Sequence, residues 1–489
     1  MQGSSVVVRW ALVVLLLLAW ALRLSPLLSS PLHPDEALYG YWGLLIGRGR
    51  DPWLTSGPVY KPPLLPYLIS VSQLILGDTT VSLRIAGAAA GLLTVPLTTA
   101  LARALYRDHW VEVPAAVAAA LSPFAVTFSG TAFPDPLMVA FGLAACLAAA
   151  RGRTRWAGLL GGLSFATKQT GLVWFPLVLG IALSRSEQPK TLGELATFYL
   201  IPVALAFAWD GVRVLLGADS FWSAGVVGYG GLRLIWSDEL WPRLRAWARL
   251  MAVLFGSPVI NALLLMGLPV LAWHGLIRNP GTRWAFFDLL LTGFCIIFAL
   301  VHWLAAFPIW ARYLLPLVPI AAVLLGRIVS VVTSLWKTPV RFSVLSTASV
   351  ALLVLMLIVP AVEASAGRSP MAEEGAAYRG VDELVSFFSD LPEGSVVYHH
   401  WLGWHYHYAL FDAPVYLAYW PTPAWLARDV QAFGRRDRRY IAFPPGESAA
   451  RVRQTLEAVG YRLKPVLPAG GVRERTSFIV YRIVPSSAP

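Results

Sequence analysis

The sequence predicts an all-α, polytopic membrane domain of about eleven transmembrane helices, followed by a small α/β domain outside the membrane. Hydrophobic residues make up 57% of the 489 residues and charged residues only 13%, a composition far from that of a soluble domain. Apolar runs long enough to span a membrane recur as far as Val362. Beyond Val362, charged residues are interspersed among apolar ones and no further spanning run occurs. We therefore predict two domains, 1–363 and 364–489.

The first apolar run, 6–24, is expected to be an uncleaved helix. Arg9 precedes its leucine-rich stretch as in a signal peptide, but no small-x-small cleavage site follows. The further predicted spans are 81–103, 113–131, 136–150, two short helices within 156–183, and then 196–216, 250–273, 285–307, 313–328 and 342–362. The apolar run 64–76 is short and begins after Pro62 and Pro63, so we expect an interfacial or re-entrant helix there.

The orientation of the protein in the membrane depends on the stretch 156–183, which could be one long helix or two short ones. The string Thr167-Lys168-Gln169-Thr170-Gly171 at its middle favours a break. With two helices, the basic connectors fall on the N-terminal side, which the positive-inside rule assigns to the cytoplasm. Those connectors carry Arg103, Arg107, Arg151, Arg153, Arg155, Arg185, Lys190, Arg278, Arg283, Lys337 and Arg341. We therefore expect a multi-pass protein of the cell membrane whose external loop 26–80 and C-terminal domain are extracytoplasmic.

The segment after Val362 predicts alternating helices and strands. Helical periodicity covers 378–390, 423–433 and 448–459, and strand-like runs cover 395–401, 439–443, 461–466 and 478–484. His405 and His407 could face the same side of a further strand. Two histidines are too few to predict a metal site, so sugar contact and ordinary surface aromatics stay open as alternatives.

Composition also excludes some classes of function. Cys146 and Cys295 both lie in apolar runs, so no disulfide framework or zinc site is predicted. The net charge of +12 comes from Arg and Lys in short connectors, which is typical of orientation signals and lipid contact, so no nucleic-acid partner is expected. No Walker sequence or dinucleotide fingerprint occurs.

Candidate site residues lie where polar side chains interrupt the apolar pattern on the predicted external side. They are Asp35, Glu36, Lys61, Asp135, Lys168 and Arg312. Charged groups beside membrane helices are costly and often bind polar or anionic substrates. Each has a structural alternative. Asp35 and Asp135 follow prolines and could cap helices, Glu36 could be solvated, and Lys61, Arg312 and Lys168 could be interfacial anchors.

Four strings resemble the GT-C glycosyltransferases of the protein O-mannosyltransferase and aminoarabinose transferase group. They are Pro34-Asp35-Glu36-Ala37 with Lys61-Pro62-Pro63-Leu64, the lone Asp135, the glycine-rich Gly161–Lys168, and Arg312-Tyr313-Leu314-Leu315-Pro316. The resemblance covers roughly residues 1 to 360. One departure is Tyr60, which stands where an acidic residue often precedes the Lys-Pro-Pro string. It weakens the carry-over of a bound divalent metal, so a metal is unsupported and metal dependence stays open.

The resemblance implies transfer of a sugar from a polyprenyl-phosphate carrier to an acceptor hydroxyl, on a protein or envelope glycolipid, at the outer membrane face with inversion. Asp35 would be the catalytic base. Glu36, Lys61, Asp135, Lys168, Arg312 and Tyr313 would bind substrate, the cations by stabilising the leaving phosphate. No cofactor is expected to be required. A transporter or flippase is the alternative, as is a non-catalytic binder of lipid-linked sugars, although no repeated halves are evident.

Overall fold

The computed structural model describes residues 2–185, 189–228, 233–334, 339–372, 377–444, 447, 449–469 and 478–486. By its internal contacts the chain forms two compact units. The first comprises Met1–Ser30 and Ile46–Ala372, and the second comprises Pro31–Leu45 and Glu373–Pro489. The second unit is therefore discontinuous in sequence, because it includes a segment that we predicted as part of the first domain's external loop.

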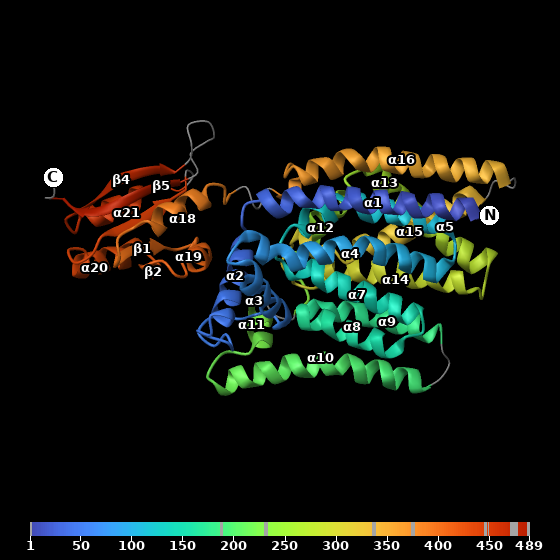
Figure 1. Cartoon of the computed structure of the whole chain (residues 1–489), viewed down its shortest axis with the longest axis horizontal. Coiled ribbons are helices and arrows are strands. Elements are labelled where there is room, and N and C mark those ends of the chain that lie inside the picture. The colour runs from blue at the N-terminus through green and yellow to red at the C-terminus, as the bar shows by residue number, and fades with distance from the viewer. Residues whose placement is uncertain are drawn as a thin grey trace. The chain divides into compact units, whose positions relative to one another are not determined.

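The first unit is a bundle of helices (Figure 1). Its long helices are α1 (Gln2–Ser29), α4 (Thr80–Tyr106), α10 (Pro189–Leu215), α13 (Pro258–Trp273), α14 (Arg283–Leu304), α15 (Leu317–Ser334) and α16 (Pro339–Ser365). Shorter helices are α3 (Leu64–Leu76), α5 (His109–Leu121), α6 (Pro123–Ser129), α7 (Pro134–Ala150), α8 (Thr154–Thr167), α9 (Trp174–Leu183), α11 (Phe221–Gly228) and α12 (Leu240–Ala252). The bundle accounts for the predicted all-α domain.

Among the described residues, seven helices are long and apolar enough to cross a membrane, or eight if α5 and α6, bent by 51°, form one span. Helix α7, the segment Gln169–Leu183 and α3 are apolar but shorter. Every predicted span overlaps a helix of the first unit, but 113–131 is divided between α5 and α6, and 250–273 contains the turn between α12 and α13. A total of eleven crossings stays a prediction, as does the interfacial position of α3.

The predicted break within 156–183 is confirmed. Helix α8 ends at Thr167, Lys168 has an extended backbone (φ −155°, ψ 135°), and a short 3-10 helix, η1 (Gln169–Val173), leads into α9. The carbonyl of Lys168 accepts a hydrogen bond from the backbone of Gly171. The break therefore turns the chain sharply at the one cationic residue of this stretch.

Helix α8 packs closely on α10 because its glycines leave room for backbone contact. A Cβ atom at Gly162 would lie 2.4 Å from the carbonyl oxygen of Tyr199 and 2.8 Å from Pro202. Only glycine fits at such an approach. The glycine-rich string that precedes Lys168 thus fixes the position of α8 against its neighbour.

The second unit contains a five-stranded mixed sheet of order β2-β1-β3-β5-β4. Strand β1 (Ser395–His399) pairs in parallel with β2 (Val415–Tyr419) and β3 (Arg439–Phe443). Strands β4 (Tyr461–Ala469) and β5 (Phe478–Pro485) add an antiparallel edge. Helices α18 (Val381–Ser389), α19 (Gly403–Ala409), α20 (Pro423–Phe433) and α21 (Ala450–Glu457) complete the predicted α/β domain.

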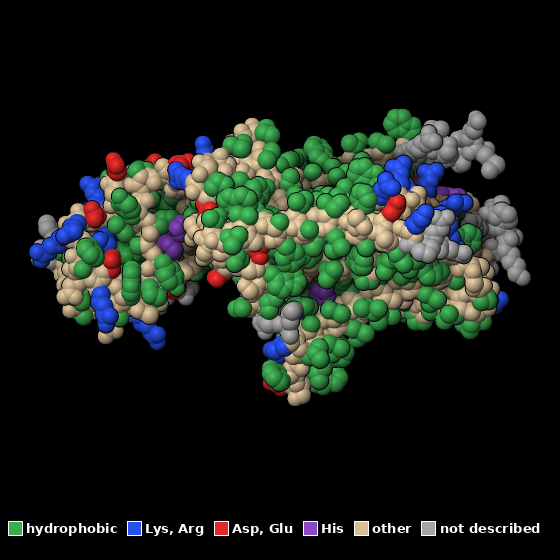
Figure 2. Space-filling model, turned by 90° about the horizontal axis from the view of Figure 1, so that it is seen from below, with side chains coloured by type: hydrophobic (Ala, Val, Ile, Leu, Met, Phe, Trp, Pro, Cys, Tyr) green, Lys and Arg blue, Asp and Glu red, His purple; other side chains and the backbone are tan. Residues whose placement is uncertain are grey.

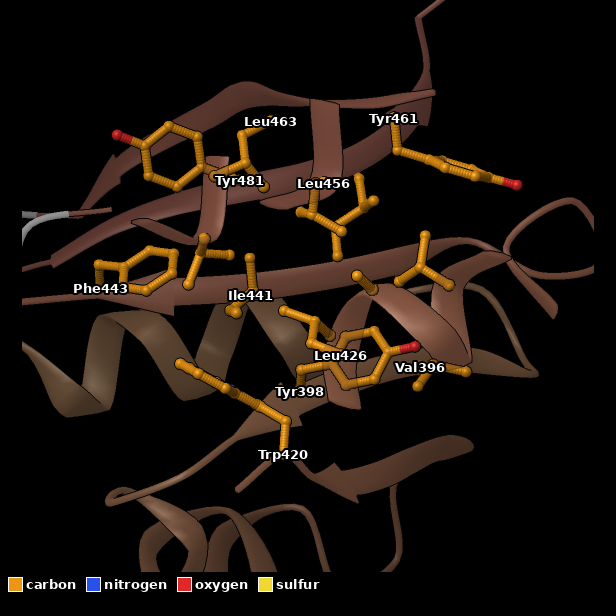
Figure 3. Close-up of a cluster of buried hydrophobic side chains, with 14 residues drawn as sticks. Val396, Tyr398, Trp420, Leu426, Ile441, Phe443, Leu456, Tyr461, Leu463 and Tyr481 are labelled. Carbon is orange, nitrogen blue, oxygen red and sulfur yellow. The ribbon is translucent and has the colours of Figure 1, made fainter. Parts of the chain in front are cut away.

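Each face of the sheet carries its own core. Leu426 of α20 and Leu456 of α21 pack on one face against Tyr398 and Ile441, as Figure 3 shows. Val430 of α20 belongs to the same core. On the other face the core includes residues of α18 and α19: Leu384, Phe388 and Tyr406. Burial on both faces explains why β1 and β3 are buried throughout.

Two predictions for this domain were wrong or incomplete. His405 and His407 do not lie on a strand, because residues Gly403–Ala409 form helix α19. There Leu402, Tyr406 and Leu410 recur every fourth residue and are buried in one core, which is helical periodicity. Strand β2 was not predicted at all.

The segment Pro31–Leu45 packs within the second unit through its helix, α2 (Pro34–Gly47). His405 Nε2 donates to the carbonyl oxygen of Leu32 at 2.9 Å. The ring of Tyr41 lies 5.2 Å from that of His407 and 5.9 Å from that of Phe411, between centroids. The motif Asp35-Glu36 is thereby held by residues more than 300 positions later in the chain.

Candidate active site

Lys168 and Asp135 form a buried ion pair in the first unit. Lys168 Nζ lies 2.5 Å from Asp135 Oδ1, and each residue is only 1% exposed. Asp135 is in the first turn of α7, between Pro134 and Pro136, where the helix dipole favours a carboxylate. The break after α8 places Lys168 opposite it. The ion pair thus brings together two candidate residues that lie in separate segments of the sequence.

The second oxygen of Asp135 distinguishes this pair from a closed structural salt bridge. Oδ2 is buried and has no hydrogen-bond partner among the described residues. A buried carboxylate oxygen left unsatisfied costs about 1–3 kcal/mol or more. Asp135 also lines a cavity, so a hydroxyl of a bound ligand could donate to Oδ2 and remove that cost.

Tyr313 lies beside the pair, and Arg312 precedes it in the chain. They belong to the 3-10 helix η3 (Ala311–Leu314) that precedes α15. Lys168 Nζ is 4.2 Å from the centroid of the Tyr313 ring, within cation–π range. The guanidinium of Arg312 lies 4.5 Å from the Phe133 ring and 4.8 Å from the Trp310 ring. The late Arg-Tyr string is therefore brought next to the start of α7.

The cavity beside the pair has a volume of about 610 Å³. Its polar end is formed by Asp135, Lys168, Gln169, His302 and Tyr313. The remaining wall is mostly apolar and comes from α9, α11 and α14, with Leu177, Trp222, Leu290, Phe294, Ile297 and Val301 among its residues. Trp222 of α11 is therefore part of the cavity wall. An apolar chamber with one charged end suits an amphiphilic ligand.

Lys61 is buried in the first unit but does not line this cavity. Its neighbour Tyr60 accepts a hydrogen bond through its carbonyl oxygen from Gln169 Nε2 at 2.7 Å. The loop that leads to Lys61 is fixed by Asp51, which accepts hydrogen bonds from the backbone and hydroxyl of Ser56, both at 2.7 Å. Burial raises the pKa of Asp51, but the hydrogen bonds from Ser56 and Thr55 outweigh it and lower the pKa overall.

Asp35 and Glu36 belong to the second unit, at the start of α2. The backbone N–H of Asp35 donates to His33 Nδ1, and Glu36 Oε2 accepts from the backbone N–H of His33, both at 3.1 Å. Glu36 is 1% exposed, so the solvated alternative was wrong for this residue. The helix start is capped by His33 and Glu36, in the manner of a capping box.

His302 is a site residue that the sequence reasoning missed. It lies on α14, lines the cavity, and its ring stacks on Phe298 at 4.0 Å between centroids. Its Nδ1 donates to the Phe298 carbonyl oxygen at 2.9 Å, which leaves Nε2 as the acceptor of a neutral ring. An ionisable residue within an apolar span was the signal that could have found it.

No group of three or more His, Cys, Asp and Glu residues could hold a metal ion within the described part of the chain. In the second unit His405 contacts Leu32, before α2, and His407 contacts Tyr41 of α2. Their helical positions, two residues apart, point them to different sides of α19.

Comparisons with known proteins agree with this architecture. A family described as dolichyl-phosphate-mannose-protein mannosyltransferase matches residues 60–209, which include Lys61, Asp135 and Lys168. Undecaprenyl phosphate-alpha-4-amino-4-deoxy-L-arabinose arabinosyl transferase 2 of Pseudomonas fluorescens Pf-5 is 32% identical over 219 residues. Transferase 1 of strain Pf0-1 is 30% identical over a match of the same length. These matches cover 42% of this chain and only 37% and 38% of the relatives.

The fold likeness is broader than the sequence likeness. The crystal structure of ArnT from Cupriavidus metallidurans bound to undecaprenyl phosphate superposes with a TM-score of 0.66 at 13% identity. The match covers 99% of this chain and 98% of the other. The apo structure of that protein gives a TM-score of 0.65. The likeness includes the C-terminal domain, which the sequence resemblance did not reach. The chain therefore has the fold of ArnT, the GT-C fold that its motifs predicted.

Proposed function

We propose that this protein is an integral-membrane glycosyltransferase that transfers a sugar from a polyprenyl-phosphate carrier to an acceptor hydroxyl at the outer membrane face. The observation that carries the proposal is the buried Asp135–Lys168 pair at the polar end of a mostly apolar cavity. The named relatives are transferases of undecaprenyl-phosphate sugars, and a protein of the same fold binds undecaprenyl phosphate. Both support a lipid-linked donor.

In this proposal the cavity holds the first isoprene units of the donor, and cationic residues hold its phosphate. Lys168, which lines the cavity, stabilises the charge that grows on the phosphate oxygen as the bond to the anomeric carbon breaks. Lys61 and Arg312, which lie outside its wall, are proposed to stabilise the same charge. Oδ2 of Asp135 accepts a hydrogen bond from a sugar hydroxyl. Tyr313 positions the Lys168 ammonium through its ring.

Asp35 is proposed as the catalytic base. Its carboxylate takes the proton of the acceptor hydroxyl while the oxygen attacks the anomeric carbon from the side opposite the phosphate. Polyprenyl phosphate leaves with the bonding electron pair, so the anomeric configuration inverts. Glu36 holds the start of α2, where Asp35 lies, through its bond to His33. The acceptor is a hydroxyl of a protein or an envelope glycolipid.

The decisive test is transfer of radiolabelled sugar from a panel of polyprenyl-phosphate sugars to native membrane extract. We expect the purified wild type to label an extractable product and Asp35→Asn to bind donor without turnover. If folded wild type binds the lipid but transfers sugar from no donor in the panel, a binder or flippase replaces the transferase. If Asp35→Asn keeps full turnover, Asp35 is not the base.

A further inference from the structure

A second cavity, of about 830 Å³, lies at the other end of α7. It is lined by residues of α1, α4, α5 and the α7–α8 turn. Helix α7 carries Asp135 in its first turn and is followed by Arg151, and these residues are about 24 Å apart along the helix axis. The second cavity is therefore separate from the one beside Lys168. Part of its wall is apolar, with Leu12 and Leu16 of α1 and Val95 and Pro96 of α4.

The other part of this wall is strongly basic. Arg103, Arg107, Arg151 and Arg185 line the cavity together with a single carboxylate, Glu112. Arg103 Nη1 lies 3.9 Å from Glu112 Oε1, too far for a hydrogen bond, so the carboxylate leaves most of the positive charge uncompensated. Figure 2 shows Lys and Arg side chains gathered at one end of the helical bundle.

Arg185 supplies independent evidence for a ligand. One of its terminal nitrogens donates to the carbonyl oxygen of Ala104 at 3.0 Å. Its Nε is buried and has no hydrogen-bond partner among the described residues. An unsatisfied buried N–H of a cationic group is costly, and an anionic oxygen in the cavity would satisfy it.

We propose that this cavity binds one anionic phospholipid. The lipid phosphate lies among the four arginines, and an acyl chain lies along Leu12, Leu16 and Val95. Basic pockets between membrane helices bind anionic headgroups through such contacts. The apolar wall favours a lipid over free phosphate, since a free ion would leave that surface uncovered. The arginines lie on the side predicted to be cytoplasmic. This site is independent of the proposed transferase activity.

The test is lipid binding to the purified, full-length protein in detergent, measured by native mass spectrometry. The probes are phosphatidylglycerol and phosphatidylcholine with identical acyl chains. We expect phosphatidylglycerol to bind more tightly. An arginine near an anionic headgroup contributes about five-fold in affinity, so the double variant Arg103→Gln/Arg151→Gln should bind it about 25-fold more weakly. The matched control is Arg153→Gln, which removes an exposed arginine that does not line the cavity.

A variant that should strengthen lipid binding distinguishes a direct effect of the arginines from loss of binding through misfolding. Glu112→Gln removes the one carboxylate of the wall, so it should tighten phosphatidylglycerol binding by about five-fold. Equal binding of the two lipids, or an Arg153→Gln effect as large as that of the double variant, would overturn the proposal. So would displacement of the lipid by millimolar inorganic phosphate at constant ionic strength, which would indicate a free-phosphate site.

Discussion

The Asp135–Lys168 pair shows how one contact can serve both folding and ligand binding. Each ion loses several kcal/mol of hydration when it is buried, and the partner charge offsets much of that loss. The pair does not use all of its hydrogen-bonding capacity, because Asp135 Oδ2 has no partner in the described chain. A purely structural pair such as Arg327–Asp288 is different. There Tyr106 also donates to the carboxylate, at 2.8 Å.

Replacing Lys168 by Met should strongly destabilise the protein, because Asp135 would stay buried without its cation. Breaking a buried pair in this way costs about 3–5 kcal/mol. The double variant Asp135→Leu/Lys168→Met should regain most of that stability but no sugar transfer. Thermal unfolding in detergent and the transfer assay measure the two effects separately.

Arg327→Met is the matched control for the Lys168 variants. It breaks another buried pair, Arg327–Asp288 at 3.1 Å, and neither residue lines the cavity beside Lys168. We expect a comparable loss of stability with transfer retained at a temperature where the variant is folded. Recovery of transfer in the Asp135→Leu/Lys168→Met double variant would show that the Lys168 pair is structural only.

Acidification should destabilise the second unit through its buried histidines. Burial lowers the pKa of His399 to about 4 and also lowers the pKa values of His405 and His407. The unfolded chain therefore binds more protons than the folded one between about pH 6.5 and 4, and stability falls as the pH drops through that window. Each such histidine contributes up to about 1.4 kcal/mol per pH unit.

The check is the melting temperature of the whole protein at pH 7.5 and pH 5. His399→Asn removes one of the protonatable groups, so its melting temperature should fall less than that of the wild type on acidification. An equal decrease in melting temperature in the two proteins would show that protonation of His399 does not contribute to the acid destabilisation.

For individual residues, the sequence identified the charged side chains of the cavity beside Lys168 but not its uncharged ones. Asp135 and Lys168 stand out because a charged residue in an apolar segment is costly and usually marks a functional site. Gln169 does not stand out, because its part in the site depends on a hydrogen bond to the Tyr60 carbonyl that only the folded chain provides. The sequence also could not show that Asp35 and Lys61 belong to different units.

Among the elements, α8 illustrates why glycines precede the site lysine. The close approach of α8 to α10 holds the end of α8, and therefore Lys168, in place. A Gly162→Ala substitution would push a methyl group against the backbone of Tyr199. We expect a loss of about 1–3 kcal/mol in the free energy of unfolding, typical of overpacking.

Gly193→Ala is the matched control for this prediction. Gly193 lies in α10, and a Cβ atom there would meet nothing within 4 Å. Alanine favours helix over glycine by up to about 1 kcal/mol, so this variant should be neutral or more stable. Equal melting temperatures for the two variants would contradict the packing argument.

The helices were more predictable than the strands for a physical reason. Long apolar runs and the polar break at Lys168 are local signals, and the predicted bounds of α3 and α20 agree with the structure. Strand β2 depends on pairing with β1. Its exposed residues Tyr416 and Tyr419 are aromatic, so the sequence shows no alternation of apolar and polar residues there. Helix α19 was mistaken because His405 and His407 alternate with aromatic residues as a strand would.

For the whole molecule, the main finding is that α2 belongs with the C-terminal domain. The composition predicted a boundary near Val362, because it changes there. It could not predict that Pro31–Leu45 packs with residues after 372, since that depends on ring and hydrogen-bond contacts across the sequence. The C-terminal domain therefore holds the segment that carries the proposed base.

Tyr41→Ala should loosen α2 from α19, because Tyr41 contacts the rings of Trp404, His407 and Phe411. We expect faster hydrogen exchange of the backbone amides of residues 37–45, and lower sugar transfer with an unchanged affinity for the donor. Tyr416→Ala, which truncates a side chain 68% exposed on β2, is the control and should change neither. Unchanged exchange in Tyr41→Ala would show that this aromatic contact does not hold α2.

The discontinuity of the second unit also constrains how the protein is made. Residues 31–45 leave the ribosome long before their partners, which begin at residue 373. At ordinary synthesis rates of about 5–20 residues per second, α2 waits roughly 15 to 65 s for the C-terminal domain while the intervening helices are inserted. A nascent chain that stops before residue 373 therefore contains Asp35 but none of the later residues that secure its helix.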